Sequence, residues 1–225
     1  MFSTGSTGQR RHTKLSNPEF FMDSLISIPF LNDESVRSTI YRKVEEFRSI
    51  GKSSKEVLFK ELVFCILAAN TSASMSLRMQ ESIGDGFLYL SRDDLRKALK
   101  ENKYRFYNVR SDFIVKSRNI IDDLPALVAS PDHEGSRDYL VENVYGIGYK
   151  EASHFLRNVG IFDFAILDKH IMKWMAQYYP VKKNTSRKNY LYNEEIFRNI
   201  SAGFGIEPGI LDLFIWYEET GTVIK

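Results

Sequence analysis

The chain has 225 residues and a hydrophobic fraction of 43%, which is enough apolar material for one large domain or two small lobes. No run approaches the roughly 20 consecutive apolar residues that cross a bilayer. The first residues also lack an apolar stretch followed by a small-residue cleavage site. We therefore expect an intracellular protein without a membrane partner. The single cysteine, Cys65, excludes an internal disulfide bond and cannot supply the roughly four thiolates of an iron–sulfur cluster.

The charge balance permits a nucleic-acid partner without favouring one. The 31 Lys and Arg residues exceed the 29 Asp and Glu residues by two, which gives a formal net charge of +2. The isoelectric point of about 8.5 lies below the value of roughly 9 that is typical of nucleic-acid-binding domains. Short basic runs, such as 10–14 and 182–188, are also what a solvated surface would carry.

Helical signals follow a polar first segment, residues 1–16, which is predicted to be a disordered tail ahead of a domain spanning 17–225. Ser91, with Asp94 three residues later, resembles a capping box and opens a helix. Other caps and apolar spacings predict helices at about 33–50, 53–69, 72–84, 109–122, 136–144, 150–159, 169–178, 193–204 and 208–218. Pro125 and Pro131 interrupt the chain between two of them. Because no alternating run is long enough for a strand and no repeat has a fixed period, the predicted class is all-α.

The segment from about 136 to 160 reads as two helices joined by a tight hairpin, Gly146-Ile147-Gly148. Glycine reaches positive φ and lets another backbone approach closely. Ile147 can fill the space between the two helices, and the N-terminus of the second helix offers unpaired N–H groups that suit a phosphate. The hairpin could therefore bind a DNA backbone without reading its sequence. From the hairpin residues alone, a turn between helices with no ligand is the favoured interpretation.

Two charged residues follow the hairpin at a suggestive spacing. Lys150 lies at the predicted start of the second helix, and Asp168 lies eighteen residues later, where another helix begins. Asp168 alone would be read as a helix N-cap, and Lys150 alone as an exposed helix lysine.

Together these residues resemble a known motif. The order of these features is similar to that in the helix–hairpin–helix glycosylase superfamily. It consists of Gly-hydrophobic-Gly-x-Lys, then a helix, and then hydrophobic-Asp-x-His-hydrophobic. The fuller string Gly-Ile-Gly-Tyr-Lys-Glu-Ala-Ser-His-Phe-Leu-Arg-Asn at 146–158 resembles the archaeal-type 8-oxoguanine DNA glycosylase/lyase family. The resemblance extends over nearly the whole chain from about Asn17. The sequence lacks the C-terminal four-cysteine cluster of the endonuclease III branch.

The resemblance implies a bifunctional enzyme of base excision repair. Lys150 would be the nucleophile that forms a Schiff base, Asp168 the catalytic carboxylate, and β-elimination would nick the strand. The implied fold has two helical lobes with the active site in the cleft between them. The implied partner is double-stranded DNA containing an oxidised base, bound by a monomer in the cytoplasm of a prokaryote. No cofactor is expected, except for a possible monovalent cation held by backbone carbonyls of the hairpin.

Further positions are candidate binding residues. Asn70, together with the glycines and Ile147 of the hairpin, is expected to contact DNA, because the superfamily often inserts a polar side chain at this place. Trp216 and Lys225 are expected to recognise the base. A flipped purine needs a flat apolar wall, which Trp216 could supply, and a terminal carboxylate at Lys225 could accept hydrogen bonds from the purine N–H groups. Phe106 could stack on a base. His154 and His170 have no third ligand at a telling spacing, so no metal site is predicted.

Three alternatives stay open from the sequence. A non-catalytic helix–hairpin–helix module would bind DNA and have no use for Lys150 with Asp168. A glycosylase of another branch would act on a different lesion. A helical protein–protein adaptor would use the hairpin only as a turn.

Overall fold

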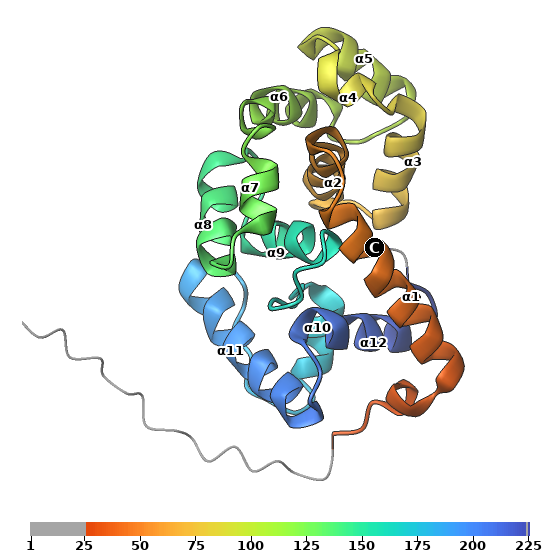
Figure 1. Ribbon diagram of the computed structural model, residues 1–225, viewed down its shortest axis with the longest axis vertical. Coiled ribbons are helices and arrows are strands. Elements are labelled where there is room, and N and C mark those ends of the chain that lie inside the picture. Colours follow the sequence, from red (N-terminus) through yellow and green to blue (C-terminus); the bar gives the residue numbers. More distant parts are fainter. Residues whose placement is uncertain (1–25, 224) are drawn as a thin grey trace, which may run out of the picture.

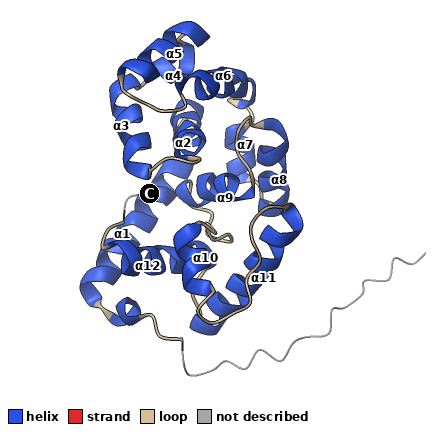
Figure 2. Ribbon diagram, turned by 180° about the vertical axis from the view of Figure 1, so that it is seen from behind, coloured by secondary structure: helices blue, strands red, loops and turns tan. Residues whose placement is uncertain are grey.

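The computed structural model describes residues 26–223 and 225, and all regular structure within that part of the chain is helical (Figures 1 and 2). The all-α prediction is therefore confirmed. The predicted tail over residues 1–16 lies outside the described residues. The α-helices are α1 (Glu34–Gly51), α2 (Lys55–Ala68), α3 (Ala73–Ile83), α4 (Gly86–Tyr89), α5 (Arg92–Glu101), α6 (Tyr107–Ser117), α7 (Leu124–Ala129), α8 (His133–Asn143), α9 (Tyr149–Asn158), α10 (Lys169–Met175), α11 (Arg187–Phe204) and α12 (Pro208–Thr220). Two short 3₁₀ segments, η1 (Pro29–Asn32) and η2 (Arg118–Ile120), complete the list.

Capping side chains start several helices where the sequence predicts them. Asp33 accepts a hydrogen bond from the backbone N–H of Val36 at 3.0 Å at the start of α1. The hydroxyl of Ser91 accepts one from the N–H of Asp94 at 3.1 Å and donates to the Asp94 carboxylate at 2.6 Å. In a full capping box, the side chain at position 94 would accept a hydrogen bond from the backbone N–H of Ser91. Here the Asp94 carboxylate accepts from the Ser91 hydroxyl instead. Such a cap stabilises a helix by about 1 kcal/mol.

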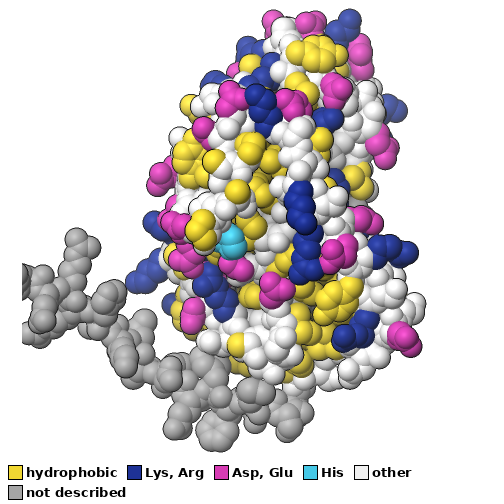
Figure 3. All heavy atoms as spheres, in the orientation of Figure 1, with side chains coloured by type: hydrophobic (Ala, Val, Ile, Leu, Met, Phe, Trp, Pro, Cys, Tyr) yellow, Lys and Arg dark blue, Asp and Glu magenta, His cyan; other side chains and the backbone are white. Residues whose placement is uncertain are grey.

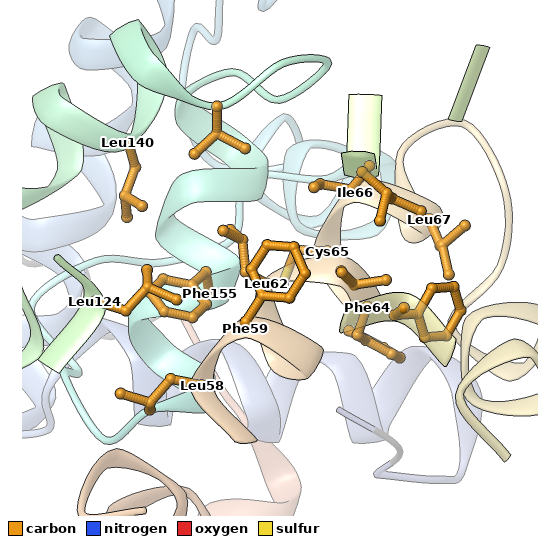
Figure 4. Packing of buried hydrophobic residues seen from close by; sticks show 14 of the residues in the cluster. Leu58, Phe59, Leu62, Phe64, Cys65, Ile66, Leu67, Leu124, Leu140 and Phe155 are labelled. Carbon is orange, nitrogen blue, oxygen red and sulfur yellow. The ribbon is translucent and has the colours of Figure 1, made fainter. Parts of the chain in front are cut away.

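The core is divided into two clusters, and this division makes the two lobes. The first cluster is built on α2, whose second half is largely apolar and buried, and on α9. Phe59, Leu62 and Phe155 are fully buried there (Figure 4). Burying each such side chain stabilises the fold by about 1.5–3 kcal/mol. Cys65 lies in the same cluster and is fully buried, as the apolar run around it predicts.

The second cluster joins α1 to the C-terminal helices α10, α11 and α12. Phe47 of α1, Trp174 of α10 and Phe214 of α12 are buried within it. Figure 1 shows α3, α4 and α5 at one end of the molecule and α10, α11 and α12 towards the other, with α9 between them. The chain therefore forms two helical lobes, as the resemblance implies, and α9 lies where they meet.

Three elements differ from the sequence prediction. The helix α7 was not predicted, because Pro125 was read only as an interruption. Proline is compatible with a first helical turn, and here it occupies that turn beside the buried Leu124. The short α4 was also missed. The helix α11 begins at Arg187, six residues before the predicted start, where Ser186 accepts a hydrogen bond from the N–H of Asn189 at 3.2 Å.

The surface carries both signs of charge. On the face in Figure 3, Lys and Arg side chains are interspersed with Asp and Glu side chains, as the small net charge leads one to expect. None of the described helices combines the length and the apolar character that crossing a bilayer would require.

Candidate active site

A cleft of about 540 Å³ lies between the two lobes. Its walls come from the α2–α3 turn, the first turns of α9 and α10, the middle of α12 and the C-terminal residues. The chain's C-terminal end lies at the waist of the molecule (Figure 1). The cleft is lined by five of the predicted site residues, namely Asn70, Lys150, Asp168, Trp216 and Lys225. A separate hollow of about 510 Å³, between α8 and α11, is lined by none of the predicted site residues. The structure thus gathers residues that are up to 155 positions apart in the sequence.

The amine of Lys150 is held at the start of α9. Its Nζ lies 3.0 Å from Oε1 of Glu151, and its side chain is 36% exposed, so the amine is reachable from the cleft. The second oxygen of Glu151 accepts a hydrogen bond from the backbone N–H of Gly148 at 3.2 Å, which caps the helix from its third position. Because Glu151 is anchored in this way, it also fixes where the amine of Lys150 rests.

Asp168 is the N-cap of α10, as its position in the sequence predicts. Its Oδ1 accepts hydrogen bonds from the backbone N–H groups of His170 at 2.8 Å and Ile171 at 3.0 Å. Its Oδ2 makes no hydrogen bond within the described part of the chain, and the residue lines the same cleft as Lys150. One carboxylate oxygen is therefore structural, and the other is free for a ligand.

A buried ion pair fixes the segment that leads to Asp168. Arg157 donates from Nη1 to Oδ1 of Asp212 at 2.7 Å, and Oδ2 of Asp212 accepts from the backbone N–H of Ile166 at 2.7 Å. Both side chains are at most 4% exposed. Burial raises the pKa of Asp212 to about 6, although the neighbouring Arg157 lowers it. The pair joins α9 of the first lobe to α12 of the second and holds the approach to Asp168.

We expect Arg157→Met to lower the free energy of unfolding by about 3 kcal/mol or more, because it leaves the Asp212 carboxyl buried without its cation. The folded-state pKa of Asp212 is already raised above its usual value. In the wild type this raised pKa costs stability as the pH rises from the unfolded value of Asp212 to about 6. Arg157 lowers the pKa of Asp212, so its removal raises the folded-state pKa further, and the loss caused by the substitution should grow between pH 5 and pH 8. Urea unfolding at both pH values measures it. The control is the double variant with Asp212→Asn, which should show no such growth. An equal loss at both pH values would contradict this account.

The deep wall of the cleft is aromatic and neutral. Trp216 is partly buried, and its ring meets that of His170 edge-on with centroids 4.8 Å apart. His154 is buried, its ring meets that of Phe64 at 5.4 Å, and its Nε2 has no hydrogen-bond partner among the described residues. Burial, with the positive charge of Arg157 nearby, lowers the pKa of His154 well below its usual range. The imidazole is therefore neutral, and it lies beside the backbone of Lys225.

The side chain of Lys225, the last residue, is directed away from the cleft. Its Nζ donates to Oε2 of Glu61 at 2.7 Å and to Oε1 of Gln80 at 3.4 Å, and it lies 5.0 Å from the centre of the Phe64 ring. Glu61 is buried, and its other oxygen accepts from Nδ2 of Asn158 at 2.7 Å. The amine therefore anchors the chain end to the first lobe, so the backbone end of Lys225 lies at the cleft.

Two loops flank the cleft. Asn70, in the α2–α3 turn, is exposed and has a φ of +63°, a conformation that few residues other than glycine adopt. In the hairpin, Gly146 has a φ of +80°, and a Cβ there would lie 2.6 Å from Nη1 of Arg110. Ile147 packs against the first cluster, and Gly148 is the N-cap of α9. The glycine at 146 is thus required, as the hairpin prediction expects.

Phe106 is not brought together with the other predicted site residues. It precedes α6, is partly buried against the first cluster and has the guanidinium of Arg105 5.1 Å from the centre of its ring. It does not line the cleft. Its role in base recognition stays a prediction without support from this geometry.

Several functional candidates were missed from the sequence. Glu61 and Asp212 are acidic residues inside apolar runs, and a buried charge requires a partner, so their positions were a usable signal. Glu151, three residues after Gly148, has the spacing of a capping box. His154 was considered only as a metal ligand. Among the described residues, no three His, Cys, Asp or Glu side chains gather as metal ligands would.

Comparisons with known proteins point to one family. The family model described as 8-oxoguanine DNA glycosylase matches residues 40–206. The chain is 67% identical over 186 residues to the 8-oxoguanine DNA glycosylase/AP lyase of Thermoplasma volcanium, covering 83% of this chain and 91% of that protein. It is 50% identical over 209 residues to that of Picrophilus torridus, covering 92% and 98%.

Solved structures agree in fold. The crystal structure of the 8-oxoguanine DNA glycosylase of Thermotoga maritima superposes with a TM-score of 0.81 at 43% identity, covering 85% of this chain and 94% of that one. The Methanocaldococcus jannaschii 8-oxoguanine glycosylase/lyase, in complex with a 15mer DNA containing 8-oxoguanine, gives a TM-score of 0.83 at 41% identity, covering 88% and 97%. With a family model that matches most of its length and relatives at this identity, the chain belongs to the 8-oxoguanine DNA glycosylase family.

Proposed function

We propose that this protein excises 8-oxoguanine from duplex DNA and then cuts the strand, with Lys150 as the nucleophile. The observation that carries the proposal is the placement of Lys150 and Asp168 on one cleft between the lobes, beside an aromatic wall that contains Trp216. A base pocket next to an amine and a carboxylate is suited to base removal through a Schiff base. A non-catalytic DNA-binding module has no use for this arrangement.

The chemistry follows from the amine. Nζ of Lys150 attacks C1′ of the flipped nucleotide with its lone pair, and the bond from C1′ to the base nitrogen breaks, with its electron pair leaving on the base. The base takes up a proton, and the nitrogen of the new C1′–N bond loses one. The bond from C1′ to O4′ then breaks, O4′ takes up a proton to become a hydroxyl, and the nitrogen lone pair forms the protonated Schiff base. Loss of the proton on C2′ then expels the 3′-phosphate by β-elimination. Only an amine can form this intermediate.

Asp168 assists at the sugar. Positive charge develops on C1′ as the base departs, and a carboxylate held nearby stabilises it. Oδ1 is occupied by the two backbone N–H groups of α10, so Oδ2 is the atom assigned to this task. The rigid cap holds the carboxylate in place before the reaction begins.

The DNA itself would be gripped outside the cleft. The hairpin at 146–148 and the N–H groups of the first turn of α9 are suited to phosphates, and we assign to the exposed Asn70 the role of entering the duplex. The carbonyl oxygen of Gly146 already accepts a hydrogen bond from Arg110 at 3.1 Å. A monovalent cation in the hairpin would therefore be held by other carbonyls of the loop. The cleft is complete within one chain, so a monomer suffices.

One panel of duplexes tests the function. Each duplex carries 8-oxoguanine, an oxidised pyrimidine, a mismatched thymine or an abasic site, and is incubated with the protein with and without borohydride. We expect cleavage and a covalent adduct with 8-oxoguanine and with the abasic site, and none with undamaged DNA. Cleavage of another lesion alone would assign the other specificity. Binding without any adduct would indicate a non-catalytic module.

Removal of Lys225 should impair 8-oxoguanine excision while sparing cleavage at an abasic site, where no base has to be recognised. The backbone oxygen of Lys225 is the group we assign to the base N–H donors, since the amine is engaged by Glu61. Single-turnover rates on both substrates measure the effect, with a decrease of about ten-fold or more for 8-oxoguanine. Equal losses on both substrates would show that the C-terminus does not read the base.

A further inference from the structure

Arg110, on α6, connects two loops that are far apart in the sequence. Its side chain lies under the surface, and the residue is only 6% exposed. Nη1 donates to the carbonyl oxygen of Gly146 at 3.1 Å, and Nη2 donates to that of Ala69 at 2.9 Å. Both nitrogens belong to one planar guanidinium, so the two carbonyls are held at a fixed separation.

Both carbonyls belong to the loops assigned above to DNA. Ala69 immediately precedes Asn70, whose positive φ turns its side chain out of the α2–α3 turn. Gly146 opens the hairpin that leads to α9. Arg110 itself does not line the cleft, so it lies behind both loops and touches neither Lys150 nor Asp168.

Neighbouring groups hold the guanidinium in this place. Its carbon lies 5.5 Å from the centre of the Phe113 ring, and that ring also packs where a Cβ on Gly146 would be. The hydroxyl of Tyr104 donates to the carbonyl of Leu67 at 2.7 Å and fixes the same end of α2. The bridge that Arg110 forms between the carbonyls of Ala69 and Gly146 is therefore part of a rigid layer beneath both loops.

The guanidinium of Arg110 is buried, and the described residues offer it no counter-charge. Within the described residues no carboxylate pairs with it, and its Nε has no hydrogen-bond partner. Burying a cation without a counter-charge costs stability, and an apolar side chain would fill such a space at less cost. A role that needs the two-pronged geometry of arginine explains why a charged group is buried here.

We propose that Arg110 is a positioning residue that sets the distance between the turn entering the duplex and the hairpin gripping its backbone. This inference rests on the DNA contacts of the proposed function. A fixed separation lets Asn70 occupy the space left by the flipped base while the hairpin holds the phosphates. Without the bridge, each loop would still form, but the two would no longer engage the duplex together.

Arg110→Lys tests the bridge, because lysine keeps the charge but cannot hold both carbonyls in one plane. The matched control is Arg118→Lys, which alters a partly buried arginine that donates to the carbonyl of Phe87 at 2.9 Å, away from both loops. The measurements are affinity for a lesion duplex and the fluorescence of 2-aminopurine opposite the lesion, which reports unstacking. Thermal unfolding of both variants provides the stability reference. If Arg110→Lys does not fold, Arg110→Gln takes its place.

We expect Arg110→Lys to bind at least about ten-fold more weakly and to lose most of the fluorescence change, while Arg118→Lys keeps both. A double-mutant cycle with Asn70→Ala adds a readout that a purely structural role would not move. Asn70→Ala should cost much less in the Arg110→Lys background than in the wild type. Additive effects, or a fluorescence change that survives in Arg110→Lys, would overturn the proposal. The excision activity of the wild type is a separate result, so failure of the function and failure of the bridge are distinguishable.

Discussion

Lys150→Gln should abolish both base release and strand cleavage and leave binding to a lesion duplex nearly unchanged. A glutamine amide is not a nucleophile and cannot form a Schiff base, so the rate should fall on the order of 10³-fold or more. The side chain of Lys150 is 36% exposed, so the change removes little packing. Single-turnover cleavage of an 8-oxoguanine duplex, with borohydride trapping, measures both steps.

Lys169→Gln is the matched control for this variant. Lys169 lines the same cleft and its substitution removes the same charge, but it leaves the amine of Lys150 in place. It should retain the covalent adduct, and any shared loss of affinity reports electrostatics rather than chemistry. Substantial trapping by the Lys150→Gln protein would refute the assignment of the nucleophile.

Asp168→Asn should lower the single-turnover rate by roughly 10²- to 10⁴-fold and cost little stability. An asparagine Oδ1 can still accept the hydrogen bonds of His170 and Ile171, and asparagine caps helices about as well as aspartate. What is lost is the negative charge at the sugar. Excision rates and thermal unfolding on the same preparation separate the two effects.

Asp132→Asn controls for capping, because Asp132 caps α8 by accepting from the N–H of Gly135 at 2.9 Å and does not line the cleft. It should match Asp168→Asn in stability and match the wild type in rate. Near-normal turnover of Asp168→Asn, or unfolding many degrees earlier, would make Asp168 a structural residue only.

The parts of the fold that the sequence predicts are those decided locally. The start of α10 at Asp168 and the course of α12 follow from a cap and from apolar spacing within one helix. The start of α11 was predicted six residues late because its first turns carry polar residues, and burial of Tyr190 in the second cluster supports them. The spacing of apolar residues along the sequence gives no information about that contact.

The same distinction applies to the site. Lys150 and Asp168 lie in one short motif, so their association can be recognised along the chain. The Glu61–Lys225 ion pair joins residues 164 positions apart, and the Arg157–Asp212 pair joins residues 55 apart. In both pairs, the residues adjacent to each charged side chain in the sequence do not indicate which distant residue it contacts. Phe106 is the converse case, since its aromatic and basic surroundings suggest a base contact, whereas it does not line the cleft and its role stays a prediction.

The burial of Cys65 has a consequence for an enzyme proposed to act on oxidised DNA. Burial raises the pKa of this thiol well above its usual value, so almost none of it is present as the thiolate that peroxides attack. Full enclosure in the first core also keeps oxidants from the sulfur. The only thiol in the sequence is therefore a poor target for oxidation to sulfenic acid.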